Sequence, residues 1–245
     1  EQIMTIEQAM IFALQRYTSA REAAAFIGEL MTTYGFLPSS GDGSEALVIC
    51  DPQEAWVFEV FGVGPGWTRA GGKPGAIWAA QRIADDHAVM IPNYSIIEQI
   101  DPADTARFMV SDNYMSEAIE RGWYDPASGK PFIWQEAYSE LPGEWATGRF
   151  WLFHTRYAPS LRDWPDRMLD GDVYKGLNQY FQVVEGEDRR PPLGVVATDA
   201  GIGGGNMLAA LACYRHPVMT AGAVVRGIGM IEHRPGPAAT TRIEA

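Results

Sequence analysis

The sequence contains two cysteines, Cys50 and Cys213, and both must be weighed as nucleophiles because a thiolate attacks a carbonyl carbon readily. Cys50 ends a run of apolar residues just before an Asp-Pro turn, where a small buried side chain fits well. Cys213 lies close in sequence to Tyr214 and His216, but a thiol and an imidazole also need a third group that orients them. We therefore expect Cys50 to be a core residue and neither cysteine to be a catalytic nucleophile.

Two other patterns resemble ligand-binding sites. Residues 85–87 read Asp-Asp-His, but three consecutive residues in a turn rarely converge on one ion, and the sequence offers them no HExxH-type partner. The glycine cluster from Gly201 to Gly205 stands between a predicted strand and a predicted helix, as a dinucleotide-binding loop would. Asn206 replaces the third glycine of that fingerprint. We expect neither a metal nor a cofactor, and nucleotide binding through this loop is kept as an alternative.

The composition is that of a globular protein with an acidic surface. Of 245 residues, 47% are hydrophobic and 20% are charged, and 31 acidic against 19 basic side chains give a net charge of -12. Such a charge repels phosphate backbones and acidic lipid headgroups, so we expect no nucleic-acid partner and no membrane partner. The sequence has no uninterrupted apolar stretch of about 18 residues and no basic-then-apolar leader, which predicts a soluble protein without assigning a compartment.

The first part of the chain is predicted to fold as a helical hairpin. Thr5 with Gln8, and Ser19 with Glu22, have the spacing of a capping box, in which side chains bond to the unpaired N–H groups at the start of a helix. Apolar residues recur at helical spacing after each box, and a glycine follows the second run. Residues 6–34 should therefore form two helices with one buried face.

Short apolar segments separated by turn residues follow the hairpin. They predict four strands of an antiparallel sheet, covered by the helical hairpin, at residues 45–50, 55–61, 76–83 and 87–91. The elements expected further along the chain are short helices at residues 111–121 and 133–141, a strand at 193–198 and a helix at 206–214.

Several blocks of the sequence, in this order, resemble the bacterial dipeptidase A-type family, whose eukaryotic relatives are the secernins. The blocks are TSAREA at 18–23, IGEL at 27–30, YGF at 34–36, ICDPQEAWVFE at 49–59, WAAQRI at 78–83, IPN at 91–93, ID at 100–101, GWYDP at 122–126 and YAPSL at 157–161. Each block alone is a weak pattern, whereas the ordered set is specific. The resemblance covers about residues 8–165, and the residues after about 185 resemble no part of the family.

The resemblance implies the α+β fold class, with the αββα sandwich of the N-terminal-nucleophile hydrolases, here incomplete because its first strands are missing. It implies a partial hydrolase domain at residues 1–185 and leaves residues 186–245 as an unassigned segment with the glycine-rich loop. In this superfamily an N-terminal Cys attacks the scissile carbonyl, and its own α-amino group is the base. Position 1 here is Glu1, so we expect the nucleophile in a missing upstream segment or a companion chain. This chain alone should not be competent.

The resemblance also implies roles for three residues. Asn93 follows a predicted strand where the family has an Asn that donates to the oxyanion, and the alternative is a turn Asn bonded to its own backbone. Arg149 precedes the YAPSL block, near the place of a family arginine, and is expected to bind substrate unless it is a surface arginine. Arg82 matches the family pattern as a second substrate-binding residue, with a structural ion pair as its alternative.

The function that the resemblance implies is that of a part or subunit of a cysteine-type dipeptidase, a thiol peptidase that hydrolyses the amide bond of a dipeptide. One alternative is a non-catalytic structural or interaction protein that keeps the fold without the catalytic strand. Nucleotide binding through the loop from Gly201 to Gly205 is the second alternative.

Overall fold

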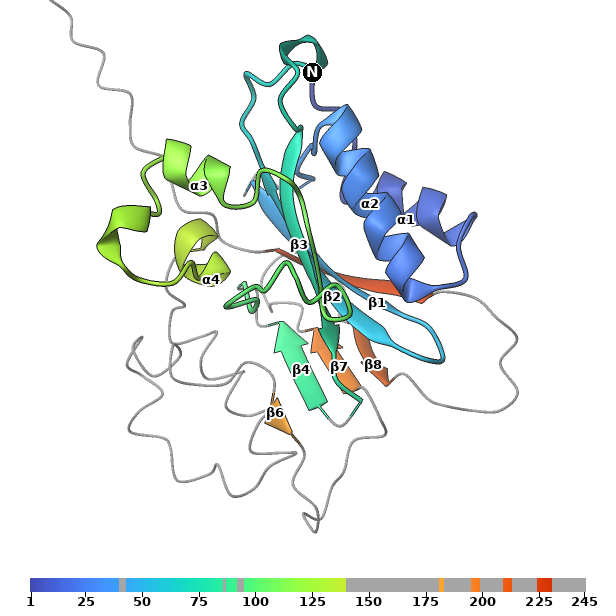
Figure 1. The fold of residues 1–245 in the computed structure, drawn as a ribbon. Helices are drawn as coiled ribbons and strands as arrows, with labels where there is room; N and C mark the ends of the chain where they lie inside the picture. Colours follow the sequence, from blue (N-terminus) through green and yellow to red (C-terminus); the bar gives the residue numbers. More distant parts are fainter. Residues whose placement is uncertain are drawn as a thin grey trace, which may run out of the picture.

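The computed structural model describes residues 1–39, 43–85, 87–91 and 95–139 and, beyond them, the backbone of four later strands. Two sheets and two groups of helices make up this part of the chain (Figure 1). The larger sheet has helices on both of its faces, and the smaller sheet lies near one end of it. The described region is therefore built in layers around the larger sheet.

The predicted helical hairpin is confirmed. Helices α1 (Ile6–Leu14) and α2 (Ala20–Tyr34) are antiparallel neighbours that cover one face of the larger sheet (Figure 1). At the start of α1, Thr5 Oγ1 accepts from the backbone N–H of Gln8 at 3.3 Å, and Gln8 Oε1 accepts from the backbone N–H of Thr5 at 3.2 Å. This is the reciprocal capping box that the spacing predicts.

The second helix is fixed at both ends and along its buried face. Ser19 Oγ accepts from the backbone N–H of Glu22 at 3.3 Å, and α2 stops at Gly35, whose φ of 75° favours glycine. Midway along α2, a Cβ atom on Gly28 would lie 2.3 Å from Cε2 of Trp78. The missing side chain at Gly28 therefore lets the helix approach the indole of Trp78 directly.

The larger sheet has the strand order β5-β3-β2-β1-β9, and its strands are β1 (Ser44–Cys50), β2 (Ala55–Gly62), β3 (Ala76–Ile83), β5 (Phe108–Val110) and β9 (Val224–Met230). All of its pairings are antiparallel, with Val48 opposite Val57 and Phe58 opposite Ala80. Every residue of β1 is buried, which means that both faces of this sheet are covered. The predicted antiparallel arrangement is confirmed for its first three strands.

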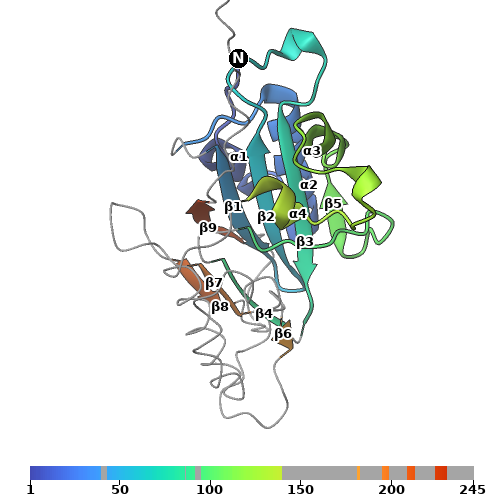
Figure 2. The ribbon, with the colours of Figure 1, turned by 90° about the vertical axis from the view of Figure 1, so that its left-hand side faces the viewer.

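Side chains of the larger sheet alternate between two buried clusters. On one face, Trp56 and Trp78 pack against the residues of α1 and α2. On the other face, Val57 belongs to a cluster that includes side chains of α3 (Ser116–Glu120) and α4 (Trp134–Tyr138). Figure 2 shows α4 in front of the sheet and α2 behind it. The sheet therefore separates two buried cores.

The prediction that the fourth strand continues this sheet is wrong. Strand β4 (His87–Ile91) pairs antiparallel with β6 and parallel with β7 in the smaller sheet, whose order is β6-β4-β7-β8. The outer edge of β3 is taken by β5, where Val110 lies opposite Ala79, so β4 has no edge of β3 to pair with. The partners of β4 in this sheet are β6 (Phe181–Gln182), β7 (Val195–Thr198) and β8 (Ala209–Ala212).

The remaining predicted elements are confirmed in part. Helices α3 and α4 lie within their predicted ranges but are shorter, and the predicted strand at 193–198 is β7. The helix predicted at 206–214 is wrong, since residues 209–212 form strand β8, which pairs antiparallel with β7. The Ala-Ala-Leu-Ala run of β8 has good helix propensity, but strand pairing overrides it. Two 3-10 turns complete the set, η1 (Arg69–Gly71) and η2 (Pro126–Ser128).

Helices packed on an antiparallel sheet place the described region in the α+β class. The αββα sandwich and the boundary at residue 185 stay predictions. Strands β7 and β9, which follow that boundary, pair with β4 and β1. Among the described residues, no helix has both the length and the apolar character that a membrane span needs.

Candidate functional site

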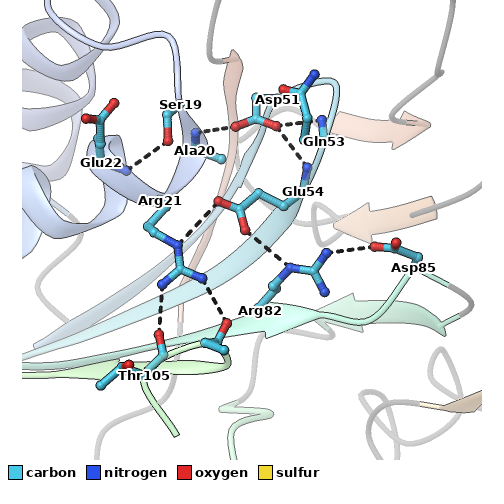
Figure 3. A network of polar contacts seen from close by, with 11 residues as sticks. Ser19, Ala20, Arg21, Glu22, Asp51, Gln53, Glu54, Arg82, Asp85 and Thr105 are labelled. Carbon is cyan, nitrogen blue, oxygen red and sulfur yellow. Dashed lines mark hydrogen bonds and ion pairs between the residues drawn. The ribbon is translucent and has the colours of Figure 1, made fainter.

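Arg82 takes part in a network of ion pairs at one end of the larger sheet (Figure 3). Its Nε donates to Glu54 Oε2 at 3.2 Å, and its Nη2 donates to Asp85 Oδ1 at 2.8 Å. Arg21 of α2 approaches the other oxygen of Glu54 at 3.6 Å and donates to the backbone carbonyl of Thr105 at 2.8 Å. The carboxylate of Glu54 thus bridges two arginines from different elements.

Asp51 fixes the turn between β1 and β2 beside this network. Its Oδ1 accepts from the backbone N–H groups of Gln53 and Glu54 at 2.7 and 2.8 Å, and its Oδ2 accepts from Ala20 N at 2.7 Å (Figure 3). One carboxylate therefore orders the hairpin turn and also bonds the first N–H of α2. The β1–β2 turn and α2 together position Glu54, and Glu54 then orients Arg82 through their ion pair.

The structure thus supports the ion-pair alternative for Arg82, and the substrate-binding role stays a prediction. Arg82 also lines a cleft of about 440 Å³. The other lining residues come from β3, the following link, β4, residues 98–99, and β5 with the residue before it. They are Gln81, Ala84, His87, Glu98, Gln99, Arg107 and Phe108. The cleft therefore brings side chains of both charge signs together at the edge of the sheet.

Arg107 is the second arginine of this cleft. Its backbone carbonyl accepts from Arg82 N at 2.8 Å, which brings the two residues side by side, and its guanidinium lies 5.5 Å from the centroid of the Phe108 ring. Planar guanidinium groups bind carboxylates in a bidentate manner. The cleft lining thus includes the guanidinium of Arg107 and the carboxylate of Glu98.

A buried carboxylate lies in the core between the sheet and α4. Glu59 of β2 is fully buried, and four donors bond to it. Oε1 accepts from the backbone N–H groups of Ile96 and Ile97 at 2.7 and 3.3 Å, and Oε2 accepts from Ser95 Oγ at 2.5 Å and Trp134 Nε1 at 2.7 Å. All four partners are neutral, so dipoles rather than a described cation balance the carboxylate.

Burial raises the pKa of Glu59 to about 7, because loss of solvent penalises the charged form more than the hydrogen bonds stabilise it. The bonds from Ser95, Ile96, Trp134 and Ile97 each act in the opposite direction and lower the pKa. Near neutral pH the side chain is therefore divided between its two protonation states.

Residues 95–98 are also held on their other side by the start of α4. Their carbonyl groups accept from the backbone N–H groups of Trp134 and Gln135, with Trp134 N bonded to Glu98 O at 3.0 Å and Gln135 N bonded to Ile97 O at 3.1 Å. The side-chain amide of Gln135 donates to Ser95 O at 2.6 Å. The segment thus bonds to α4 through its carbonyls and to Glu59 through its N–H groups.

Sequence reasoning placed Glu59 only in a family block and assigned it no role. A signal was present, because an acidic residue interrupts the apolar run of β2, and a charge buried in such a run needs partners. The cleft had no comparable signal. Gln81 and Phe108 lie on different segments of the chain, and the pairing of β3 with β5 brings them opposite each other.

The other predicted site residues are placed as follows. Asn93 and Arg149 lie outside the described residues, as do Cys213 and the glycine loop from Gly201 to Gly205, so the roles predicted for them stay predictions. Cys50 is 2% exposed and belongs to the core cluster under α4, which confirms the prediction that it is a core residue. A buried thiol in mid-core is shielded from substrate.

Comparison with known proteins identifies the family. The sequence profile of peptidase family C69 matches residues 1–169. A protein named "Probable dipeptidase" from Salmonella dublin is 30% identical over 146 residues, which cover 58% of this chain and 30% of that protein. "Probable dipeptidase B" from Lactococcus lactis subsp. lactis (strain IL1403) is 31% identical over 120 residues, 49% of this chain and 21% of that protein.

The aligned region thus spans less than a third of the length of either relative. No solved structure matches the chain. The profile match extends over more than half of the sequence and includes the helical hairpin, the first three strands of the larger sheet and the segment bonded to Glu59. The dipeptidase resemblance drawn from the sequence blocks is therefore confirmed, and the chain belongs to peptidase family C69.

Proposed function

We propose that this chain is part of a cysteine-type dipeptidase that hydrolyses the amide bond of dipeptides. The observation that carries the proposal is the family match over residues 1–169, together with two relatives named as dipeptidases. The cleft at the end of β3 adds support, since Arg82 and Arg107 both line it and a guanidinium group suits the carboxylate of a free dipeptide.

The proposed nucleophile is an N-terminal Cys outside these 245 residues. Its thiol would attack the scissile carbonyl carbon while its own α-amino group takes the proton, and the departing amine would then receive that proton. Water would hydrolyse the resulting thioester and release the acid product. Cys50 is unsuited to this step because it is buried in the core of the sheet.

The residues of this chain would serve binding and charge stabilisation. Asn93 is proposed as the donor to the oxyanion that forms when the carbonyl carbon becomes tetrahedral. Arg82 and Arg149 are proposed to bind the substrate carboxylate. The guanidinium of Arg82 would bind the substrate while it also bonds to Glu54 and Asp85. The position of Arg82 in the lining of the cleft supports this role.

The test compares this chain with the complete gene product that contains it, using Ala-Ala and a small panel of other dipeptides. We expect turnover by the complete product, loss of turnover after treatment with iodoacetamide, and none by the 245 residues alone. Turnover by the 245 residues that disappears in Cys50→Ala or Cys213→Ala would show that the nucleophile is misassigned. A folded complete product without any peptide hydrolysis would favour the non-catalytic alternative.

A further inference from the structure

The buried carboxylate of Glu59 accepts backbone hydrogen bonds from the segment that follows β4, as a neighbouring strand would do in a sheet. The carbonyl groups of Ser95, Ile97 and Glu98 are bonded to the first residues of α4. The N–H groups of Ile96 and Ile97 point the other way and are bonded to Glu59 Oε1. Buried backbone N–H groups must find an acceptor. Glu59 Oε1 therefore accepts the hydrogen bonds that the carbonyl groups of a neighbouring strand would otherwise accept.

Keeping a carboxylate at this position is unfavourable in itself. The position lies in an apolar run of β2 where Leu or Met would fill the space without loss of hydration. The bonds described for Glu59 all come from neutral groups, and no ion pair among the described residues offsets the burial. What the carboxylate provides is a rigid link between β2, residues 95–97 and the indole of Trp134.

The segment held in this way leads directly into the cleft. Glu98 and Gln99 follow Ile97 in the chain and line the same cleft as Gln81 and Arg82 of β3. Asn93, the proposed oxyanion donor, stands two residues before Ser95 in the sequence. In the sequence, the residues bonded to Glu59 therefore lie between Asn93 and the cleft residues Glu98 and Gln99, and the proposed reaction uses both.

We infer that Glu59 is a positioning residue, which holds residues 95–99 against β2 and α4 in the conformation that dipeptide hydrolysis requires. The expected effect on turnover rests on the proposed function. The claim that Glu59 holds residues 95–99 in place does not depend on that function. Glu59 touches no substrate, and it acts through the segment that it bonds.

The chain offers a matched control for this inference. Glu45 of β1 is also fully buried, and its Oε1 accepts from the backbone N–H of Ser39 at 2.9 Å and from the Ser39 hydroxyl. Burial raises the pKa of Glu45 as well. Glu45 belongs to the neighbouring strand but bonds residue 39 rather than residues 95–99. Glu45→Gln therefore changes a second buried carboxyl group of the same sheet without removing a bond to the anchored segment.

The experiment measures hydrogen exchange and dipeptide kinetics in the complete gene product carrying Glu59→Gln or Glu45→Gln. In Glu59→Gln, exchange of the amides at residues 96–97 should become at least about tenfold faster, because two charge-assisted bonds are weakened. The kcat per folded molecule should fall about 10- to 100-fold with a smaller change in KM, as expected for a displaced catalytic group. Glu45→Gln should change neither quantity, whatever its melting temperature.

Each result decides a separate point. Unchanged exchange at residues 96–97 in Glu59→Gln would overturn the inference, and so would faster exchange with an unchanged kcat, which would make the anchor purely structural. If wild type hydrolyses no dipeptide but exchange at residues 96–97 is faster in Glu59→Gln, the result would support the anchoring role of Glu59 and refute the proposed function. If Glu59→Gln does not fold, Ser95→Ala removes one of the four donors with little change in volume and should show the same two effects at smaller amplitude.

Discussion

Acidic side chains occupy two contrasting environments in this chain. Glu54 lies at the partly exposed end of the sheet between Arg21 and Arg82, where water screens the charges and the net stabilisation of such pairs is about 0–1 kcal/mol. Glu59 lies in the core with neutral donors alone, where little screening occurs. Water therefore screens the interactions of the buried carboxylate less than those of the exposed network.

The protonation of Glu59 predicts how stability depends on pH. Its pKa rises from 4.5 to about 7 on folding, so the folded protein binds this proton more tightly than the unfolded chain does. The resulting stabilisation is fully present below pH 4.5 and is lost as the pH rises through about 7. Since each pKa unit corresponds to about 1.4 kcal/mol, wild type should lose about 3 kcal/mol relative to Glu59→Gln across this range.

Urea unfolding of wild type and Glu59→Gln at a series of pH values measures this difference. Taking the difference between the two proteins cancels other groups that titrate in the same range, including Glu45. Parallel stability curves for the two proteins would show that Glu59 keeps an ordinary pKa in the folded state.

For Asn93 the prediction separates catalysis from stability. If it donates to the oxyanion, Asn93→Ala in the complete enzyme should lower kcat by about 10²–10³-fold, because the bond forms only as charge develops. A turn Asn would instead lower the free energy of unfolding by about 1 kcal/mol and leave kcat per folded molecule unchanged. Steady-state kinetics and the melting temperature of the same variant distinguish the two roles.

At the scale of the elements, the contact between α2 and β3 controls how the helical hairpin sits on the sheet. Trp78 is held there by stacking on Phe58, with ring centroids 5.5 Å apart, and by a bond from its Nε1 to Thr32 Oγ1 at 3.0 Å. Because the indole is fixed in this way, it has little freedom to move aside for a bulkier residue at Gly28. The close approach of α2 to β3 at this point thus depends on the absence of a side chain at Gly28.

Gly28→Ala should therefore destabilise the protein. Alanine alone would favour the helix by about 1 kcal/mol, but the added Cβ would lie 2.3 Å from the Trp78 ring, and overpacking of this kind costs about 1–3 kcal/mol. We expect a net loss of stability on thermal unfolding and a changed near-UV signal from Trp78. Gly66→Ala is the control, since a Cβ there meets nothing within 4 Å; a stabilised Gly28→Ala would contradict the tight contact.

At the scale of the whole molecule, the last part of the chain contributes to both sheets. Residues of β9 pair with β1 from Glu45 to Cys50, and β7 lies beside β4. Without these strands, β1 and β4 would each lose a neighbour and expose unpaired backbone groups. The described backbone thus joins regions that the sequence analysis divided at residue 185.

A chain that ends at residue 185 should for this reason be less stable than the 245-residue chain. Loss of the pairing of β1 with β9 is expected to lower the melting temperature by on the order of 5–10 °C and to favour aggregation through the β1 edge. Circular dichroism melts and light scattering of the two chains measure this. Equal melting temperatures would support an independent domain at residues 1–185.

Features with local causes were predictable from the sequence. The caps of Thr5 and Ser19 act over three residues, and the glycine at position 35 ends α2 by its own backbone freedom, so both helices were predicted correctly. The first three strands were predictable because apolar runs and short turns specify a hairpin and its neighbour. Membership in the dipeptidase family also followed from ordered blocks of residues.

Features that depend on contacts between distant segments were decided by the tertiary structure alone. Strand β4 leaves the larger sheet because β5 occupies the edge of β3, and β8 is a strand because β7 pairs with it, although its residues favour a helix. Glu59 appears in the sequence as one acid in an apolar strand, and its four donors come from residues 36 to 75 positions further along the chain. Such partners are joined only by folding, since local propensity and spacing carry no information about which distant donors will meet a buried carboxylate.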